Sequence, residues 1–342
     1  MKIPIENIYY LLCYAWNKLD EKDKVNISVE DKTELLDLFA KILINASKTL
    51  LKRGIDKNYN DYTEEILGIK GKLRIAETLK RNILFKQKTI CDFDDFSANI
   101  ISNRILVTTI YRLTRTKGVD KDLKNELVLL LKMFNEISQI EITNSLFKQI
   151  KINRNNHFYG FIMNVCKIIF ENTLPSEEQG RYKFTDFTRD EHKMNQLFEA
   201  FVRNFYRIEQ KKYPSVRREI IQWNFDKSEN DSNLPQMETD ITLENETDKI
   251  IIDTKYYAET MTDRFGSEKI KSSNLYQLFS YLLNQENDTE KTQKSTGILL
   301  YPTVINEYDL KYRYKNHSIQ IRTINLNQNW TGISRKLIDI IA

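Results

Sequence analysis

Hydrophobic residues recur at helical spacing through most of the first half of the chain. Residues 32–53 place leucine, isoleucine and phenylalanine along one side of a helix, and Gly54 follows as a suitable C-terminal cap. Helical periodicity returns in three later segments, residues 99–117, 121–134 and 158–169. Between the first helix and these segments, residues 55–96 carry short β-like runs broken by Gly68 and Gly71. The pattern therefore predicts a mainly helical N-terminal domain with a β-rich insertion.

A polar stretch at residues 172–180 interrupts the periodic segments and marks the expected domain boundary. After it, helical and strand-like patterns alternate. The predicted helices are residues 191–210, 274–283 and 333–341, and the predicted strands are residues 216–225, 234–243, 249–257, 296–301 and 318–326. This order predicts an α/β fold in which a sheet is flanked by helices. We therefore expect two domains, residues 1–175 and 176–342.

Two acids and a lysine fall on neighbouring predicted strands. Asp240 lies near the end of the first strand, and Asp253 and Lys255 lie in the second, after a turn at residues 244–247. Because side chains alternate across a strand, Asp253 and Lys255 share one face. The turn brings Asp240 beside Asp253, and two carboxylates form an oxygen-rich site suited to Mg²⁺ or Mn²⁺. Since a lysine beside such a site can position or deprotonate a water molecule, the pattern indicates a metal-dependent phosphodiester hydrolase.

The alternative is that Asp-x-Lys has arisen by chance, but both charges follow three isoleucines, and an unpaired charge leaving a buried strand is costly. Gln277 and Tyr281, four residues apart on a predicted helix, share a face that would point to a scissile phosphate. Their alternative is a surface amide and a half-buried ring. The backbone carbonyl of Thr254 is a candidate further metal ligand. Glu199, on the helix predicted before the strands, is either another ligand or a solvated glutamate between core residues.

The order of these motifs resembles that of the PD-(D/E)xK nucleases, specifically their RecB-like branch. Further segments resemble the McrC family, the nuclease subunits of McrBC modified-cytosine restriction systems. The segments that carry the resemblance are residues 3–16, 68–73, 182–187, 237–241, 253–257 and 274–278, in the family's order. Thr239 stands where the superfamily's name has a proline. The resemblance is not weakened by this change, because only the carboxylate of Asp240 would meet the metal.

The resemblance implies a DNA endonuclease that acts on double-stranded DNA carrying modified cytosine, together with a hexameric AAA+ GTPase of the McrB type. It also implies that the N-terminal part docks into this ring and stimulates GTP hydrolysis. A projecting hairpin of residues 60–90 would suit the pore of a ring. Lys70, Lys72 and Arg74 are its candidate contacts, unless they form a solvated strand face. The Gly-Ile-Lys-Gly-Lys run at residues 68–72 lacks Walker A spacing, so GTP would bind only to the partner.

Composition limits these expectations without deciding between them. The 52 Lys and Arg against 48 Asp and Glu give a net charge of only +4, so DNA binding would be local or shared with a partner. Cys13, Cys91 and Cys166 are far apart in apolar settings and are typical of reduced core cysteines, which favours a cytoplasmic protein. Two other functions remain open: an assembly and GTPase-activating subunit with a vestigial nuclease site, and a stand-alone RecB-like nuclease.

Overall fold

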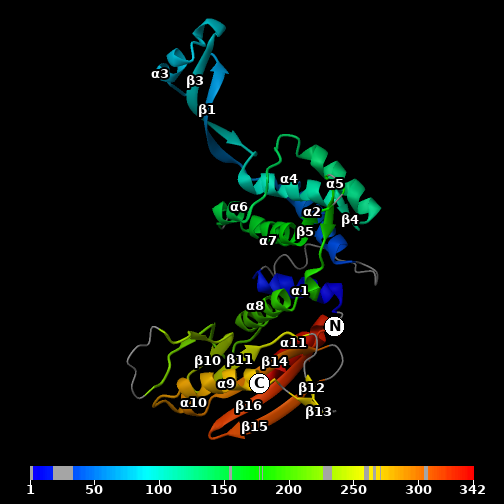
Figure 1. The fold of residues 1–342 in the computed structure, drawn as a ribbon, viewed down its shortest axis with the longest axis vertical. Helices are drawn as coiled ribbons and strands as arrows, with labels where there is room; N and C mark the ends of the chain where they lie inside the picture. The colour runs from blue at the N-terminus through cyan, green and yellow to red at the C-terminus, as the bar shows by residue number, and fades with distance from the viewer. Residues whose placement is uncertain are drawn as a thin grey trace. The chain divides into compact units, whose positions relative to one another are not determined.

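The computed structural model describes residues 3–17, 34–153, 156–176, 178, 180–225, 233–257, 262–264, 267–269, 271–303 and 307–342. The chain forms two compact units (Figure 1). Met1–Thr33 and Asp186–Ala342 make up the first unit, and Glu34–Thr185 makes up the second. This division differs from the expected boundary after residue 175. The N-terminal helix belongs with the C-terminal half of the chain, and the polar stretch at residues 172–180 is not a linker.

The second unit is built on helices, as the periodicity predicted. Its helices are α2 (Leu35–Arg53), α4 (Ile101–Thr114), α5 (Lys121–Met133), α6 (Asn144–Gln149) and α7 (His157–Asn172). Residues 32 and 33, the predicted start of the first helix, lie outside the described residues. A small sheet beside the helices has the order β4-β6-β5, formed by β4 (Thr116–Lys117), β5 (Thr173–Pro175) and β6 (Tyr182–Phe184). The polar stretch that we expected to separate the domains therefore contributes a strand to this sheet.

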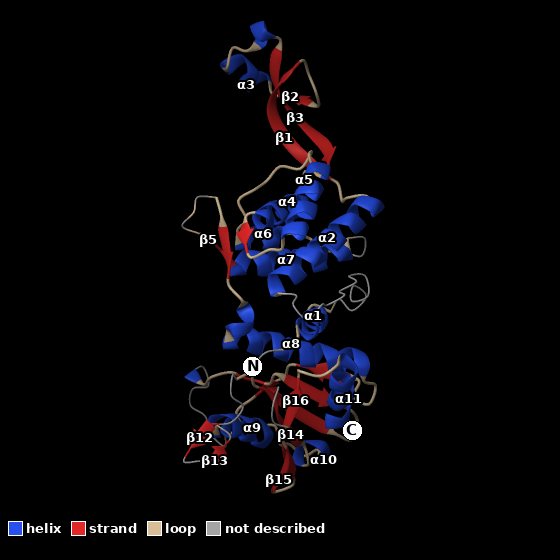
Figure 2. Ribbon diagram, turned by 90° about the vertical axis from the view of Figure 1, so that its right-hand side faces the viewer, coloured by secondary structure: helices blue, strands red, loops and turns tan. Residues whose placement is uncertain are grey.

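The β-rich insertion is a long hairpin that extends away from the helices of its own unit (Figure 2). Strands β1 (Asn58–Leu67) and β3 (Lys88–Ser97) pair antiparallel over their whole length, and β2 (Lys72–Leu73) adds to β3. Helix α3 (Ile75–Lys80) and the short 3-10 turn η2 (Leu84–Lys86) complete the far end. Gly71 has a φ of 69°, and a Cβ there would lie 2.2 Å from the Asp92 carbonyl oxygen. Only glycine therefore fits this turn.

The first unit contains a six-stranded sheet in the order β15-β16-β14-β11-β10-β7. Its strands are β7 (Ser215–Arg217), β10 (Ile241–Glu244), β11 (Lys249–Thr254), β14 (Thr296–Thr303), β15 (Asp309–Tyr314) and β16 (His317–Asn325). Strands β11, β14 and β16 run parallel to one another, and the other pairs are antiparallel. Two smaller pairs lie beside this sheet: β8 (Ile220–Ile221) with β9 (Met237–Glu238), and β12 (Thr262–Arg264) with β13 (Ser267–Lys269). The predicted α/β architecture is confirmed at this level.

Helices cover both faces of this sheet (Figures 1 and 2). On one face, α9 (Ser272–Asn284) buries Leu278, Tyr281 and Leu282 in a cluster with Ile251 of β11. A Cβ at Gly297 would lie 2.8 Å from Leu282 Cδ1, so this glycine permits the close approach of α9 to β14. On the other face lie α8 (Glu191–Glu209), α1 (Ile5–Ala15) and α11 (Trp330–Ile340). The short helix α10 (Glu290–Gln293) follows α9.

Helix α1 is an integral part of the first unit rather than of the second. The Tyr14 ring lies 5.4 Å from the Phe205 ring of α8 and 5.2 Å from the Trp330 ring of α11. The Asn7 side chain, which is buried, donates hydrogen bonds to the carbonyl oxygens of Leu326 and Gln328, each at 2.8 Å. In the described part of the chain, no helix combines the length and the hydrophobicity needed to cross a membrane.

Candidate active site

Asp240 lies at a break in what the sequence predicted to be one continuous strand. Residues 234–243 form two short strands instead, β9 and β10, which belong to different sheets, and Asp240 lies between them. The buried Thr239 fixes the break, because its N–H donates to the Glu219 carbonyl at 2.9 Å and its hydroxyl accepts from the Glu219 N–H at 3.0 Å. The Asp240 carboxylate then accepts from the amide and the hydroxyl of Thr254, at 2.8 and 2.9 Å.

Asp253 and Lys255 emerge from the fully buried strand β11 on the face that packs against α9. The pairing of Ile241 with Ile252 places Asp240 across from Asp253, as the predicted hairpin required. Lys255 Nζ lies 2.9 Å from each carboxylate oxygen of Asp253. The Lys255 amide donates to the Leu300 carbonyl of β14 at 3.0 Å, which holds its backbone in line with the strand. The structure therefore brings together Asp240, Asp253 and Lys255.

Burial controls the electrostatics of these three groups. The pKa of Asp253 is raised to about 7, because its side chain is fully buried and Asp240 lies nearby, although the Lys255 ammonium opposes the shift. Burial also raises the pKa of Asp240, again against the attraction of Lys255. Burial alone would lower the pKa of Lys255, but the charges of Asp253 and Asp240 outweigh it and the pKa is raised. Burial therefore opposes ionisation of both acids, and a bound cation would stabilise their charged forms in this water-poor setting.

The carboxylates fit a hard metal ion. Asp253 Oδ2 is buried and accepts no hydrogen bond of good geometry, even though Lys255 Nζ lies 2.9 Å away. A buried oxygen without a hydrogen-bond donor is costly unless another group, such as a cation, faces it. The described residues hold no group of three or more His, Cys, Asp or Glu side chains arranged as a metal site. A cation here would therefore rest on two carboxylates and on further oxygens from the backbone, the substrate or water.

Glu199 is buried beside this pair and is not the solvated glutamate that we gave as an alternative. Only 10% of its side chain is exposed, and its negative charge contributes to the raised pKa of Asp240 and of Asp253. Its Oε1 accepts from Arg203 at 2.6 Å and from Arg218 Nε at 2.9 Å. Sequence reasoning missed both arginines, although the spacing of Glu199 and Arg203 is the i, i+4 spacing of a helical ion pair.

Gln277 and Tyr281 connect α9 to the segment that carries Asp240. Gln277, which is exposed, donates from Nε2 to the Tyr281 hydroxyl at 2.7 Å, and this hydroxyl donates to the Glu238 carbonyl at 2.9 Å. The Tyr281 ring is buried, and burial together with the nearby charges of Asp253 and Asp240 raises its pKa to about 12. Tyr281 is therefore a neutral donor that holds the backbone two residues before Asp240.

Asparagines hold the residues that follow Lys255, and no local pattern in the sequence indicates this. Asn195 of α8 accepts from the Tyr256 amide at 2.8 Å. Asn274 of α9 accepts from the Tyr257 hydroxyl at 3.2 Å and donates to the Tyr301 hydroxyl of β14 at 3.0 Å. The chain is thus anchored on both sides of the sheet directly after the catalytic candidates.

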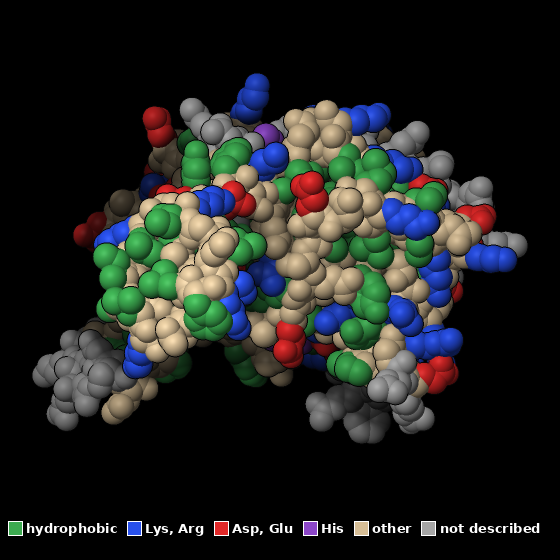
Figure 3. All heavy atoms as spheres, turned by 90° about the horizontal axis from the view of Figure 1, so that it is seen from above, with side chains coloured by type: hydrophobic (Ala, Val, Ile, Leu, Met, Phe, Trp, Pro, Cys, Tyr) green, Lys and Arg blue, Asp and Glu red, His purple; other side chains and the backbone are tan. Residues whose placement is uncertain are grey.

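Two of the three basic residues predicted to contact the partner are engaged within the hairpin. Lys70 Nζ lies 3.5 Å from Asp95 and 4.2 Å from the centre of the Phe93 ring. Arg74 forms ion pairs with Asp92 at 2.7 Å and with Glu77 at 2.8 Å, whereas Lys72 is exposed. Large hydrophobic side chains are also exposed at this end of the hairpin, among exposed basic residues: Leu67, Ile69, Ile75, Leu79, Leu84 and Phe85. Figure 3, seen from the end of Figure 1 at which the insertion lies, shows hydrophobic side chains open to solvent.

Comparisons with known proteins agree on one family. A family model described as McrBC 5-methylcytosine restriction system component matches residues 6–302. The chain is 34% identical over 340 residues to the Escherichia coli K12 protein named type IV methyl-directed restriction enzyme EcoKMcrBC, and the match covers 99% of this chain and 97% of that relative.

The fold is also similar to that of a chain from a Thermococcus gammatolerans assembly described as McrB AAA+ hexamers with bound McrC. The TM-score is 0.57 at 16% identity, over 98% of this chain and 76% of that one. At this level of identity the likeness shows a shared fold, and the sequence matches show the family.

Proposed function

The chain belongs to the McrBC family of restriction-system components, and we propose that it is the Mg²⁺-dependent DNA endonuclease subunit of a GTP-dependent complex directed at modified cytosine. One observation carries the proposal. Asp240, Asp253 and Lys255 meet at the end of a buried strand, where Asp253 has an oxygen that no donor satisfies. This is the arrangement of a PD-(D/E)xK nuclease, and the order of strands and helices around it supports the same assignment.

Each residue has a distinct role in the proposed hydrolysis. Asp240 and Asp253 would hold Mg²⁺, or Mn²⁺ in its place, together with the Thr254 carbonyl. The bound cation would supply positive charge to the phosphate and assist activation of the attacking water. Lys255 would position this water with its ammonium, which Asp253 holds beside the site, and would deprotonate the water only after releasing its own proton. The water oxygen attacks phosphorus, one P–O ester bond breaks, and the departing oxygen takes up a proton.

Gln277 and Tyr281 support this chemistry from α9. The exposed amide of Gln277 is available to the DNA backbone, while Tyr281 fixes the peptide that leads to Asp240. Glu199 contributes negative charge, but Arg203 and Arg218 both bond to its Oε1, and their positive charges oppose the binding of a metal ion by this carboxylate.

The rival in which this chain only assembles a complex and carries a vestigial site is less well supported. A vestigial site would have lost the constraint on its charged groups, whereas Asp240, Asp253, Lys255 and Gln277 are all present and hydrogen bonded. The rival of a stand-alone RecB-like nuclease does not account for the second unit with its extended hairpin. The two rivals make different testable claims: a vestigial site predicts no cleavage even with the partner, and a stand-alone nuclease predicts the same cleavage without it.

The proposed partner is a hexameric AAA+ GTPase of the McrB type, as in the Thermococcus gammatolerans assembly. We expect the insertion to dock into this ring and to stimulate GTP hydrolysis, and recognition of modified cytosine to belong to the partner. Because Lys70 and Arg74 are paired within the hairpin, the exposed side chains of Leu84 and Phe85 are better candidates for the contact. An exposed apolar surface at the end of a projecting hairpin is typical of a protein-binding site.

The nuclease proposal is tested by GTP- and Mg²⁺-dependent cleavage of methylated plasmid DNA with the purified partner. Asp253→Ala and Lys255→Ala should each reduce cleavage by about 10²-fold or more, because each removes a contact to the transition state. The same variants should still bind the partner and stimulate its GTPase. Glu290→Ala, which removes a highly exposed acid of the same unit, is the matched control. Cleavage at the wild-type rate by either site variant would rule out the assignment.

The docking proposal is tested by titrating the partner's GTP turnover with variants of this chain. Phe85→Asp combined with Leu84→Asp should weaken stimulation more than the triple replacement of Lys70, Lys72 and Arg74 by alanine. Leu129→Asp is the control, because Leu129 is a similarly exposed apolar residue on α5. Stimulation by the Phe85 and Leu84 variant at wild-type protein concentrations would show that docking uses another surface.

A further inference from the structure

Arg218 is a half-exposed arginine at the rim of the candidate active site. It lies in the short segment between β7 and β8, and 45% of its side chain is exposed. Its guanidinium bonds to Glu199 through both Nε and Nη2, and Nη1 lies 3.7 Å from Glu238 Oε2. The negative charge of Glu199 in turn contributes to the raised pKa of Asp240 and of Asp253. Arg218 therefore contacts Glu199, a buried acid of the site, and is also accessible to solvent.

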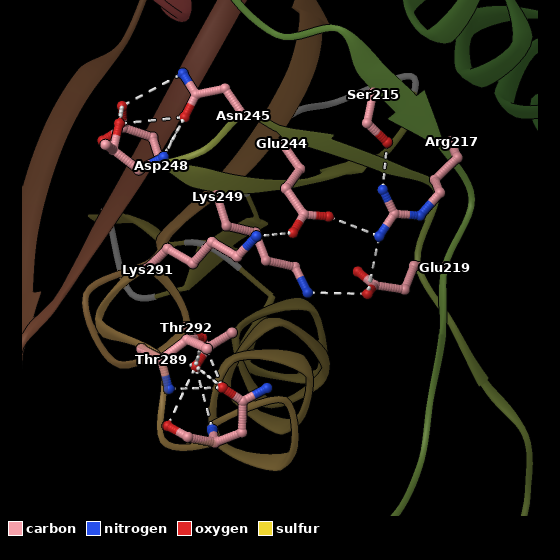
Figure 4. Close-up of polar contacts among 12 residues, drawn as sticks. Ser215, Arg217, Glu219, Glu244, Asn245, Asp248, Lys249, Thr289, Lys291 and Thr292 are labelled. Carbon is pink, nitrogen blue, oxygen red and sulfur yellow. Dashed lines mark hydrogen bonds and ion pairs between the residues drawn. The ribbon is translucent and has the colours of Figure 1, made fainter.

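The residues on either side of Arg218 are anchored elsewhere, which leaves Arg218 directed at the site. Arg217 Nη2 lies 2.7 Å from Glu244 and 3.4 Å from Glu219, and Glu219 accepts from Lys249 at 2.9 Å (Figure 4). This network is partly to largely buried, and the Lys249 side chain is only 5% exposed. The backbone of Glu219 also bonds to Thr239, next to Asp240. The segment around Arg218 is thus fixed to the loop that carries the metal-binding candidate.

Arg218 does not engage both oxygens of Glu199, because its Nε and Nη2 donate to the same oxygen, Oε1. A guanidinium presents a planar fork of N–H donors that matches the paired oxygens of a carboxylate or of a phosphate. Glu199 is also held by Arg203, whose side chain is only 16% exposed and which additionally bonds to the Asp240 carbonyl. Arg203 is therefore a fixed partner of Glu199. Arg218 can move towards solvent while Glu199 keeps its bond to Arg203.

We propose that Arg218 binds the phosphate of the cleaved phosphodiester, and that Glu199 occupies its guanidinium until DNA arrives. This inference rests on the proposed nuclease function and deepens it. When Arg218 moves to the phosphate, Glu199 loses one of its two cationic partners, and the positive charge that opposes a cation at Asp240 and Asp253 falls. DNA binding and metal binding would then support each other, since each removes a competitor of the other.

The exchange is tested by Mn²⁺ binding to the full chain without DNA, measured by calorimetry or by the electron paramagnetic resonance of free Mn²⁺. Arg218→Gln should bind Mn²⁺ about fivefold more tightly than the wild type, which is the size expected for release of a half-exposed ion pair. In a chain that already carries Glu199→Gln, the same replacement should give no gain. The double-mutant cycle separates release of Glu199 from the general loss of one positive charge. Arg313→Gln removes an exposed positive charge on β15 and is the matched control.

Cleavage with the partner provides a second measurement. Arg218→Gln should lower kcat/KM by about 10²-fold, and Arg218→Lys should recover part of this loss because it keeps the charge but not the planar fork. The proposal is overturned if Arg218→Gln leaves Mn²⁺ affinity unchanged, or if its gain persists with Glu199→Gln. Asp253→Asn tests the proposed function separately. If this variant binds Mn²⁺ as tightly as the wild type, the metal does not bind at the proposed site, and the nuclease proposal itself fails. Loss of Mn²⁺ binding in Asp253→Asn with no effect of Arg218→Gln would overturn only the role of Arg218.

Discussion

Replacement of Asp253 by asparagine should make the metal-free protein more stable at pH 8, even though it should abolish cleavage. The carboxylate is fully buried, and burial raises its pKa from 3.8 to about 7. A charged Asp253 is therefore more costly in the folded chain than in the unfolded chain. Asparagine has nearly the same shape and carries no charge, so it removes this cost. Residues selected for catalysis commonly reduce stability in this way.

The linkage between proton binding and folding gives the size and the pH dependence of this gain in the free energy of unfolding. Below pH 3.8 the carboxyl is protonated in both states, and the charge costs nothing. As the pH rises towards 7, the unfolded chain releases the proton first, and the folded state loses about 1.4 kcal/mol for each pH unit. The difference between 3.8 and about 7 gives a cost of about 4 kcal/mol above pH 7. This cost already includes the attraction of Lys255, because that attraction is one of the causes that set the pKa of Asp253.

Chemical denaturation of wild type and Asp253→Asn in excess chelator, at several pH values, measures this directly. The gain in the free energy of unfolding should be largest at pH 8 and should fall by about 2–3 kcal/mol by pH 5, from the same linkage. Added Mn²⁺ should stabilise the wild type and not the variant, because the ion neutralises the buried charge. The reasoning would be refuted if the difference between the two proteins did not change between pH 8 and pH 5. Asp288→Asn, which replaces an exposed acid, is the control for general charge effects.

Four further outcomes follow from the structure. Mg²⁺ and Mn²⁺ should support cleavage while Ca²⁺ binds without supporting it, because its coordination is looser, and full activity in excess chelator would exclude the metal mechanism. Tyr281→Phe should lower the free energy of unfolding by about 1 kcal/mol, as measured by denaturation, because the Glu238 carbonyl loses its donor. Gln277→Ala should slow cleavage in a plasmid assay without this loss, because Gln277 is exposed. Deletion of residues 1–17 should destabilise the unit that carries the site, detectable as a lower Tm than that of the full chain, because loss of Tyr14 would leave Phe205 and Trp330 exposed.

The sequence predicted the parts of the fold that depend on local periodicity. The helices that became α4, α5, α8 and α9 and the hairpin of β10 and β11 all have strong repeating patterns, and the family resemblance is confirmed by the comparisons. Edge strand β15 was missed although Leu310, Tyr312 and Tyr314 alternate with charged residues, because the run is short and its residues are mostly exposed. The prediction of one continuous strand at residues 234–243 was wrong, because the strand is interrupted between β9 and β10. Its break depends on Thr239, whose partner Glu219 lies twenty residues earlier and is invisible to a local pattern.

The same limit explains which parts of the candidate site were visible. Asp253 and Lys255 could be found because they lie two residues apart on one strand, so their contact follows from strand geometry alone. The environment of Glu199 could not be predicted, because Arg218 reaches it from the segment between β7 and β8. A pattern within one element shows which side chains share a face, but the neighbours that meet that face are set by tertiary packing. Burial of Glu199 between two arginines therefore changes it from an ordinary helical glutamate into a group whose partner can be exchanged.

The placement of α1 has a further consequence for how the two proposed activities are connected. The chain begins in the unit that carries the candidate nuclease site, passes through the whole of the unit that carries the hairpin, and returns to the first unit at Asp186. The hairpin unit is thus an insertion into the candidate nuclease unit, joined to it by two segments of chain. Fragments cut at residue 175 would divide the candidate nuclease unit, because α1 packs against α8 and α11. The separate roles of the two units can be assigned only with variants that keep residues 3–17 and 186–342 together, and a variant in which a short linker replaces Glu34–Thr185 would isolate the candidate nuclease intact.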